Sequence, residues 1–273
     1  MKKTTRLLPR LQLPVFSKRQ QFVAVTVVLT LVLMATQLIS DTLRLDVLLV
    51  VSGIAYILSA LSLREELRGW DFVTLLILPS YFTAAVFVFY FLLPTLWLTR
   101  LPIAVLYAVG IYAILLTENI YNVASERTIQ LLRAAHSVGF LLTLVTTFFL
   151  MDTVLSLRLP FYLNSVTSIV VLFPLILQAL WSMELTQKIS AMVLWSSFSL
   201  TLILTELVVL FSFWPIRTTI EALFITTIFY SLVGMTQQFL IGRLFPNTTR
   251  EFLLVLVIVF FLVMGMTRWG ATL

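Results

Sequence analysis

The chain has 273 residues, of which 60% are hydrophobic and only 11% are charged. Soluble globular proteins contain about 45–50% apolar and about 25% charged residues, so this composition excludes a soluble protein. The formal net charge is +6, with no cysteine and a single histidine. These counts exclude disulfides, cysteine-ligated metals and a multi-histidine metal site, and we expect no cofactor and no metal.

Long apolar runs divide the sequence into about nine segments. Each is about 17–25 residues long, enough to cross ~30 Å of hydrocarbon as a helix that rises about 1.5 Å per residue. The runs lack the period-two alternation of membrane β-barrel strands. The predicted spans are Gln20–Ile39, Leu45–Leu63, Trp70–Leu93, Leu101–Thr117, Thr128–Met151, Leu163–Met183, Ile189–Phe213, Thr218–Gly242 and Phe252–Arg268. The sequence therefore predicts an all-α fold, a polytopic integral membrane helical bundle of about nine transmembrane helices.

A basic tail precedes the first span, with positive charges at Lys2, Lys3, Arg6, Arg10, Lys18 and Arg19. Such a tail favours contact with anionic lipid headgroups, and we expect no nucleic acid partner. The apolar run that follows exceeds the about 7–15 residues of a signal peptide and lacks a small-residue cleavage site, which favours a retained anchor. We expect two regions: residues 1–19, a basic cytoplasmic tail, and residues 20–273, a single transmembrane helical domain.

The distribution of positive charge predicts the orientation. Most of the 18 lysines and arginines fall in the tail and in every second connection between spans. Because cytoplasmic segments are enriched in these residues, the N-terminus is predicted in the cytoplasm and the C-terminus outside. We expect a multi-pass protein of the cell membrane, either a plasma membrane or a bacterial inner membrane.

Two prolines lie inside apolar runs, Pro79 in the third span and Pro174 in the sixth. Proline lacks the N–H that a helix interior needs and its ring clashes with the preceding turn. We expect both spans to be kinked, with freed backbone carbonyls that neighbouring helices or water must satisfy.

The densest polar stretch joins the fourth span to the fifth. A break is expected within residues 122–125, with Ser125 as the N-cap of a helix that begins at Glu126. Residues 128–137 then either enter the inner leaflet or lie along the interface. The candidate functional residues of this stretch are Glu118, Asn122, Glu126, Arg127, Gln130, Arg133 and His136.

Two interpretations of this stretch are open. In the first, the polar side chains line a cavity that faces the cytoplasm, where Arg133 binds an anionic group and His136 relays protons with a glutamate. In the second, the stretch is a solvated loop followed by the first turns of a span, with long side chains that reach the surface. Gln237, near the inner end of the eighth span, either completes the same polar layer or bonds across helices.

Glu206 lies inside the seventh span with apolar residues on both sides, about seven residues or ~10 Å from the outer end. A carboxyl group there must be protonated, paired or open to a polar cavity. Thr226, Thr227 and Tyr230 of the eighth span are candidate partners. The hypotheses are proton or cation coupling and a structural hydrogen bond between two helices.

Three classes of function stay open. We favour a transporter or channel for a small solute or ion, on the basis of Glu206, the inner polar stretch and the two prolines. The second class is a structural or assembly subunit, with a membrane protein partner or a second copy of the chain. The third is a lipid-acting enzyme in which His136, Arg133 and Glu126 handle the headgroup. No nucleotide-binding, zinc-protease or serine-hydrolase motif is present, so an enzyme is the less expected outcome.

Overall fold

The computed structural model describes residues 17–36, 44–63, 71–92, 97–124, 131–186 and 188–267. Within these ranges the chain forms nine helices and no strand, and each helix is long and apolar enough to cross a membrane. The helices are α1 (Lys18–Ala35), α2 (Arg44–Leu63), α3 (Asp71–Leu92), α4 (Trp97–Ala124), α5 (Leu132–Ser156), α6 (Phe161–Glu184), α7 (Ala191–Phe211), α8 (Thr218–Leu240) and α9 (Pro246–Met266). The predicted all-α, multi-spanning fold is confirmed.

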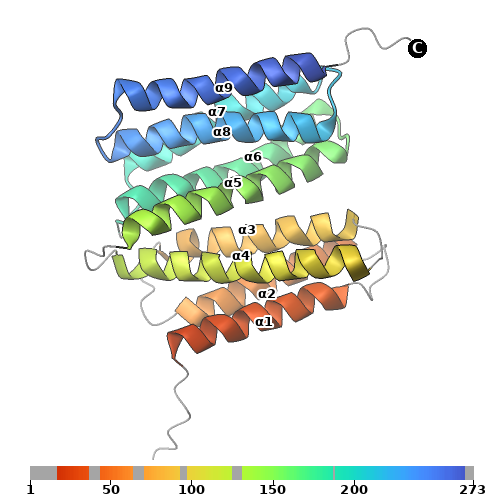
Figure 1. Cartoon of the computed structure of the whole chain (residues 1–273), viewed down its shortest axis with the longest axis vertical. Helices are drawn as coiled ribbons and strands as arrows, with labels where there is room; N and C mark the ends of the chain where they lie inside the picture. Colours follow the sequence, from red (N-terminus) through yellow and green to blue (C-terminus); the bar gives the residue numbers. More distant parts are fainter. Residues whose placement is uncertain are drawn as a thin grey trace, which may run out of the picture.

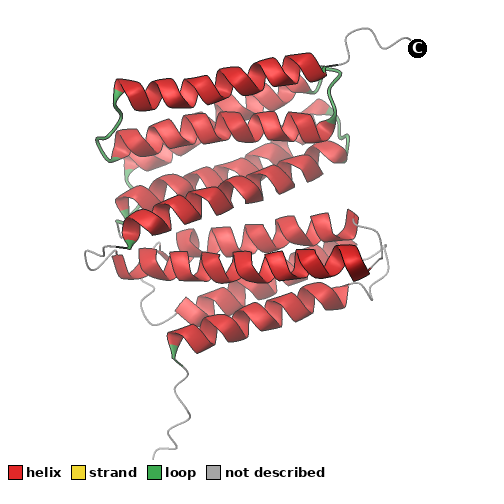
Figure 2. Ribbon diagram, viewed as in Figure 1, coloured by secondary structure: helices red, strands yellow, loops and turns green. Residues whose placement is uncertain are grey.

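The helices pack in two layers of antiparallel neighbours (Figure 1). Helices α1, α4, α5 and α8 follow one another in the first layer, and α2, α3, α6 and α7 form the second. Helix α9 extends the first layer at its edge, packed against α8. Helices account for nearly all of the described chain (Figure 2). We call the end of the bundle where α1 begins, on the left of Figure 1, the inner end, and the opposite end the outer end.

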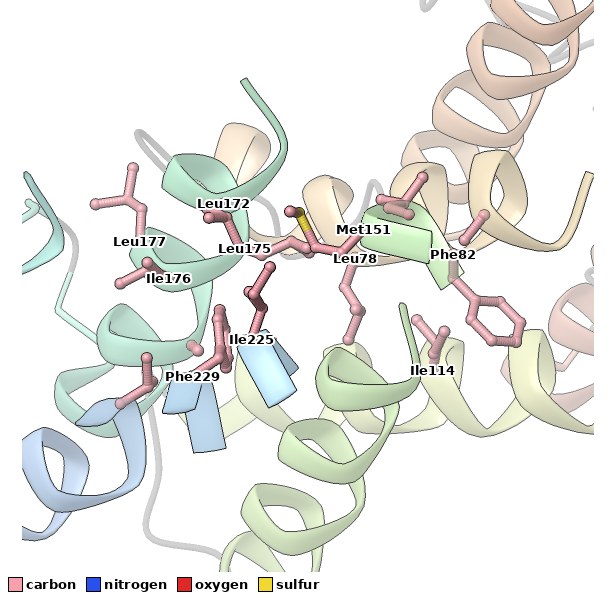
Figure 3. Packing of buried hydrophobic residues seen from close by; sticks show 14 of the residues in the cluster. Leu78, Phe82, Ile114, Met151, Leu172, Leu175, Ile176, Leu177, Ile225 and Phe229 are labelled. Carbon is pink, nitrogen blue, oxygen red and sulfur yellow. The ribbon is translucent and has the colours of Figure 1, made fainter. Parts of the chain in front are cut away.

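The middle of the bundle is apolar. Leu172, Leu175 and Ile176 of α6 pack with Ile225 and Phe229 of α8, and all five side chains are buried (Figure 3). Lipid tails are as apolar as leucine, so helices in a membrane associate through close packing and through hydrogen bonds between helices. Close apolar packing of this kind holds α6 against α8 in the middle of the bundle.

The helices begin or end up to several residues away from the predicted positions, and α5 runs from Leu132 to Ser156 instead of from Thr128 to Met151. Three of the other differences have a local physical cause. Helix α1 begins at Lys18, because Ser17 and Gln20 form a capping box that satisfies the first backbone N–H groups. Helix α9 begins at Pro246, a residue well suited to the first turn because its missing N–H has no intrahelical partner there. Helix α4 continues to Ala124, past the predicted end at Thr117, because polar side chains in its last turns bond to other helices. The predicted helix start at residues 125–126 lies outside the described residues.

Both prolines of the apolar runs lie inside helices, Pro79 in α3 and Pro174 in α6. The carbonyl that Pro174 leaves without its helical partner is that of Val170, four residues earlier. The hydroxyl group of Tyr81 in α3 donates a hydrogen bond to this carbonyl. A neighbouring helix thus satisfies the freed backbone group, as the sequence predicts for the sixth span.

Candidate functional site: a basic groove and the buried polar layer behind it

A buried carboxyl–amide pair connects α4 and α6 near the inner end. The Gln178 amide of α6 donates a hydrogen bond of 2.9 Å to Oε1 of Glu118 in α4. Each side chain lies six residues before the end of its helix, at the same depth of about 9 Å. Glu118 is fully buried and Gln178 is 2% exposed. Oε2 of Glu118 and Oε1 of Gln178 are buried without a hydrogen-bond partner, so the pair retains unused acceptors.

The C-terminal part of α6 accepts hydrogen bonds from side chains of two other helices. His136 of α5 donates from Nε2 to the carbonyl of Ser182, at 2.8 Å, and Gln237 of α8 donates to the carbonyl of Ala179, at 2.9 Å. The Ser182 carbonyl is one of the last four of α6, which lack intrahelical partners, and the C-cap residue Leu185 has a left-handed conformation. His136 and Gln237 therefore fix the end of α6 to α5 and α8.

Tyr121 continues the polar layer from α4 to α5. Its hydroxyl group donates to the carbonyl of Ala135 at 3.0 Å, and its ring lies 5.5 Å from that of His136. Gly139 permits this approach, since a Cβ atom there would lie 2.5 Å from the Tyr121 hydroxyl oxygen. Asn122, one residue further along α4, donates to the carbonyl of Leu63 at the end of α2. The layer thus joins α2, α4, α5, α6 and α8.

A groove of about 630 Å³ opens at the inner end beside this layer. Its walls come from α5, α6, α8 and the segment after α8, and they combine basic, polar and apolar side chains. The lining residues are Leu132, Arg133, His136, Ser137, Phe140, Met183, Gln237, Gln238, Ile241 and Arg243. No acidic residue is among them, so the groove is an electropositive site.

A specific backbone turn positions Arg243. Gly242 has φ +66°, a left-handed conformation that glycine adopts without strain. The Gly242 N–H bonds to the carbonyl of Phe239, and the Arg243 N–H bonds to that of Gln238, which is the Schellman pattern of a helix end. The turn brings Arg243 to the groove, where Arg133 lies on α5. In the described part of the chain, neither guanidinium forms an ion pair.

The structure divides the residues predicted from the polar stretch into three groups. Arg133, His136 and Gln237 line the groove, and His136 and Gln237 also bond to backbone carbonyls. Glu118 and Asn122 are buried among the helices and do not line it. The other three, Glu126, Arg127 and Gln130, lie outside the described residues. The choice between the cytoplasm-facing cavity and the solvated loop stays a prediction, since Glu126, Arg127 and Gln130 lie in the undescribed segment.

The sequence leaves three states open for the Glu206 carboxyl group: protonated, paired or open to a polar cavity. Glu206 is exposed on the face of α7 that points away from the bundle, beside the exposed apolar residues Ile203 and Leu210. The hydroxyl groups of Thr226 and Thr227 bond to carbonyls of their own helix. Glu206 does not line the groove and forms no hydrogen bond with Thr226, Thr227 or Tyr230 of α8.

Buried polar groups that the sequence did not single out lie near the outer end. Glu221 in the first turn of α8 is 6% exposed, and Asn164 in the first turn of α6 is 5% exposed. Each has a buried oxygen without a hydrogen-bond partner. Polar residues are common at the ends of membrane spans, where they meet water and lipid headgroups, so the sequence gave no reason to single these two out. Gln178 was missed for the same reason, since it lies near the end of its span.

Among the described residues, no group of three acidic or histidine side chains is placed to hold a metal ion.

Nine apolar helices in the described chain and a groove at one end of the bundle define a polytopic helical membrane protein. Searches against protein families, curated proteins and solved structures return no match for this chain. The function is therefore argued from the site alone.

Proposed function

We propose that the protein is a transporter that takes up an anionic ligand at the groove of the inner end. The groove carries this proposal: among the described residues, two arginines without ion pairs line it and no acidic side chain does. Charge-assisted hydrogen bonds from guanidinium groups are among the strongest that a protein offers an anion. The predicted orientation places this groove on the cytoplasmic side of the cell membrane.

Buried polar side chains behind the groove wall support transport over simple surface binding. Gln237 lines the groove and bonds to the carbonyl of Ala179, which is adjacent in sequence to Gln178. Gln178 in turn bonds to Glu118, a buried carboxyl group with one unpartnered oxygen. Ionisable groups inside a membrane are costly and are retained mainly in ion and substrate pathways. We therefore propose Glu118, in place of Glu206, as the residue that couples proton or cation movement to transport.

Reconstitution into liposomes tests the proposal. Two processes would be measured: efflux of inorganic phosphate, and transfer of fluorescent phosphatidylglycerol between leaflets. We expect at least one to be faster with the wild-type protein than in protein-free vesicles. The variant R133Q/R243Q should slow it about tenfold or more, because a lost charge-assisted hydrogen bond costs about 1.5–3 kcal/mol. The matched control is R217Q, an exposed arginine at the outer end. Rates equal to those of protein-free vesicles in both assays would contradict transport.

Glu206 favours a second candidate, a subunit of a membrane assembly. A carboxyl group that faces outward among apolar side chains is costly in lipid unless another helix supplies a partner. The absence of cysteine from the chain permits a clean test with the single substitution Leu210→Cys on the same face. Disulfide cross-linked dimers in native membranes would support assembly through α7. Exclusively monomeric protein, with efficient cross-linking of a known dimer in parallel, would count against it for a second copy.

A further inference from the structure

The groove combines features that indicate one chemical class of ligand. We propose that it binds the phosphate group of an anionic membrane amphiphile, such as a phospholipid, with Arg133 and Arg243 as the binding residues. This assignment rests on the proposed transport function for its physiological meaning, but the binding itself can be measured separately.

The charge of the groove selects an anion. Arg133 and Arg243 come from different segments, α5 and the turn after α8, and they line one groove. Two like charges that share a site repel each other, and an anion between them removes that cost. Guanidinium groups match the geometry of phosphate oxygens through paired N–H donors. The site therefore suits a phosphate group better than a neutral polar ligand.

Arg133 and Arg243 are the charged hydrogen-bond donors among the lining residues. Nε2 of His136 and the amide of Gln237 are already bonded to carbonyls of α6. Those side chains form a fixed polar surface, whereas both guanidinium groups are exposed. A ligand in the groove thus contacts a wall whose polar side chains are held by hydrogen bonds to the backbone of α6. The two arginine side chains are free to adjust their positions to the ligand.

The apolar part of the groove distinguishes an amphiphile from a free anion. Phe140, Met183 and Ile241 share the walls with the two arginines. Phe140 lies seven residues after Arg133 in α5, about 10 Å deeper into the bundle. Its ring stacks with Tyr230 of α8, and Tyr230 contacts Phe252 of α9. Aromatic side chains therefore extend from the groove across α5, α8 and α9. An acyl chain can pack against them, whereas a phosphate ion gains nothing from such a contact.

The place of the groove in the bundle agrees with this ligand. It lies where α5 begins and α8 ends, and the ends of membrane-spanning helices lie close to the headgroup region of a bilayer. Basic pockets between transmembrane helices on the cytoplasmic side bind the headgroups of anionic lipids in other membrane proteins. A lipid can enter such a site from the side, without crossing the apolar core.

Lipid binding would be measured on the full-length protein by native mass spectrometry after extraction into a mild detergent. The probes are phosphatidylglycerol, phosphatidylcholine and inorganic phosphate. We expect phosphatidylglycerol to bind at least about tenfold more tightly than phosphatidylcholine. R133Q/R243Q should lose that preference, whereas R217Q, with the same charge change per residue at the outer end, should keep it. Folding of each variant would be checked by its thermal unfolding profile, and the single variants R133Q and R243Q substitute if the double variant unfolds.

Three results would overturn the inference: equal binding of the two lipids, an unchanged preference in R133Q/R243Q, or protection from unfolding by inorganic phosphate with no retained phosphatidylglycerol. The last result assigns the groove to a free phosphate ion. A fourth outcome separates the two proposals: the protein binds lipid in an arginine-dependent way, but neither lipid nor phosphate moves in liposomes. That outcome supports the inference and contradicts only the proposed transport function.

Discussion

The hydroxyl group of Tyr81 in α3 donates a hydrogen bond of 3.0 Å to the carbonyl of Val170 in α6. Val170 precedes Pro174 by four residues, so its carbonyl has no helical N–H to accept from. The proline in α6 and the tyrosine in α3 thus form one structural unit, although 93 positions separate them in the sequence. This relation makes a specific energetic prediction.

Tyr81→Phe should destabilise the protein by about 1 kcal/mol, the typical net contribution of one hydrogen bond. In a Pro174→Ala background the residue at 174 regains its N–H and can bond to the Val170 carbonyl. The same tyrosine change should then cost less, and a double-mutant cycle on the free energy of unfolding measures the difference. An identical cost in both backgrounds would show that the two residues are not coupled. Tyr162→Phe, an exposed position in α6, serves as the control.

Glu118→Leu should destabilise the bundle by about 1–3 kcal/mol, because it leaves the buried Gln178 amide without its acceptor. Glu118→Gln keeps an acceptor oxygen and should cost less. With Gln178→Leu added to Glu118→Leu, most of the stability should return, since both polar partners are then replaced by apolar groups. Unfolding free energies in detergent micelles provide the measurement. A Glu118→Leu protein as stable as the wild type would contradict the role of this pair, and Glu251→Gln at an exposed position is the control.

Gly242→Ala should destabilise the end of α8 by about 1–2 kcal/mol, because an L-residue is strained at φ +66°. It should also weaken lipid binding, since this turn positions Arg243. Gly53→Ala is the matched comparison: Gly53 lies inside α2, and a Cβ atom there meets no atom within 4 Å. Alanine is the better helix former by about 1 kcal/mol, so the two substitutions should change the melting temperature in opposite directions. Equal effects would refute the turn assignment.

The predicted orientation can be tested because the chain has no cysteine. Lys188→Cys lies in an inner connection and Arg217→Cys in an outer one, and both positions are exposed. A membrane-impermeant thiol reagent added to intact cells should label Arg217→Cys and leave Lys188→Cys unlabelled until the cells are opened. The reverse pattern would place the groove on the outer side of the membrane.

The fold was predictable because hydrophobic run length determines membrane spans directly. The direction in which each side chain faces was not, and Glu206 and Gln178 show why. In a soluble helix a polar face marks the surface, but lipid is as apolar as the interior of the bundle. Ser197, Thr201 and Thr205 mark the buried face of α7, but the apolar residues on both sides of Glu206 in the sequence do not show that its carboxyl group faces outward. Gln178 lies one helical turn after Pro174 in a similarly apolar run, but its side chain faces the interior and bonds to Glu118.

The groove was predictable only in part. Arg133 and His136 belong to a dense polar stretch, whereas Arg243 lies in a short connection about a hundred residues later. The signal for its position is Gly242, a common residue directly after a helix end. That signal identifies a turn but does not show which helix lies next to it, so the two arginines could be combined only in three dimensions.

The two-layer arrangement also bears on how the protein is made. Each helix packs against the one before it in the sequence, and the described helices find their other main neighbours at most three positions away. A membrane protein that enters the bilayer during synthesis can therefore bury each new helix against helices already in place, starting from α1. Helix α9, which packs against α8, is then the last addition to a bundle whose other helices have already found their partners.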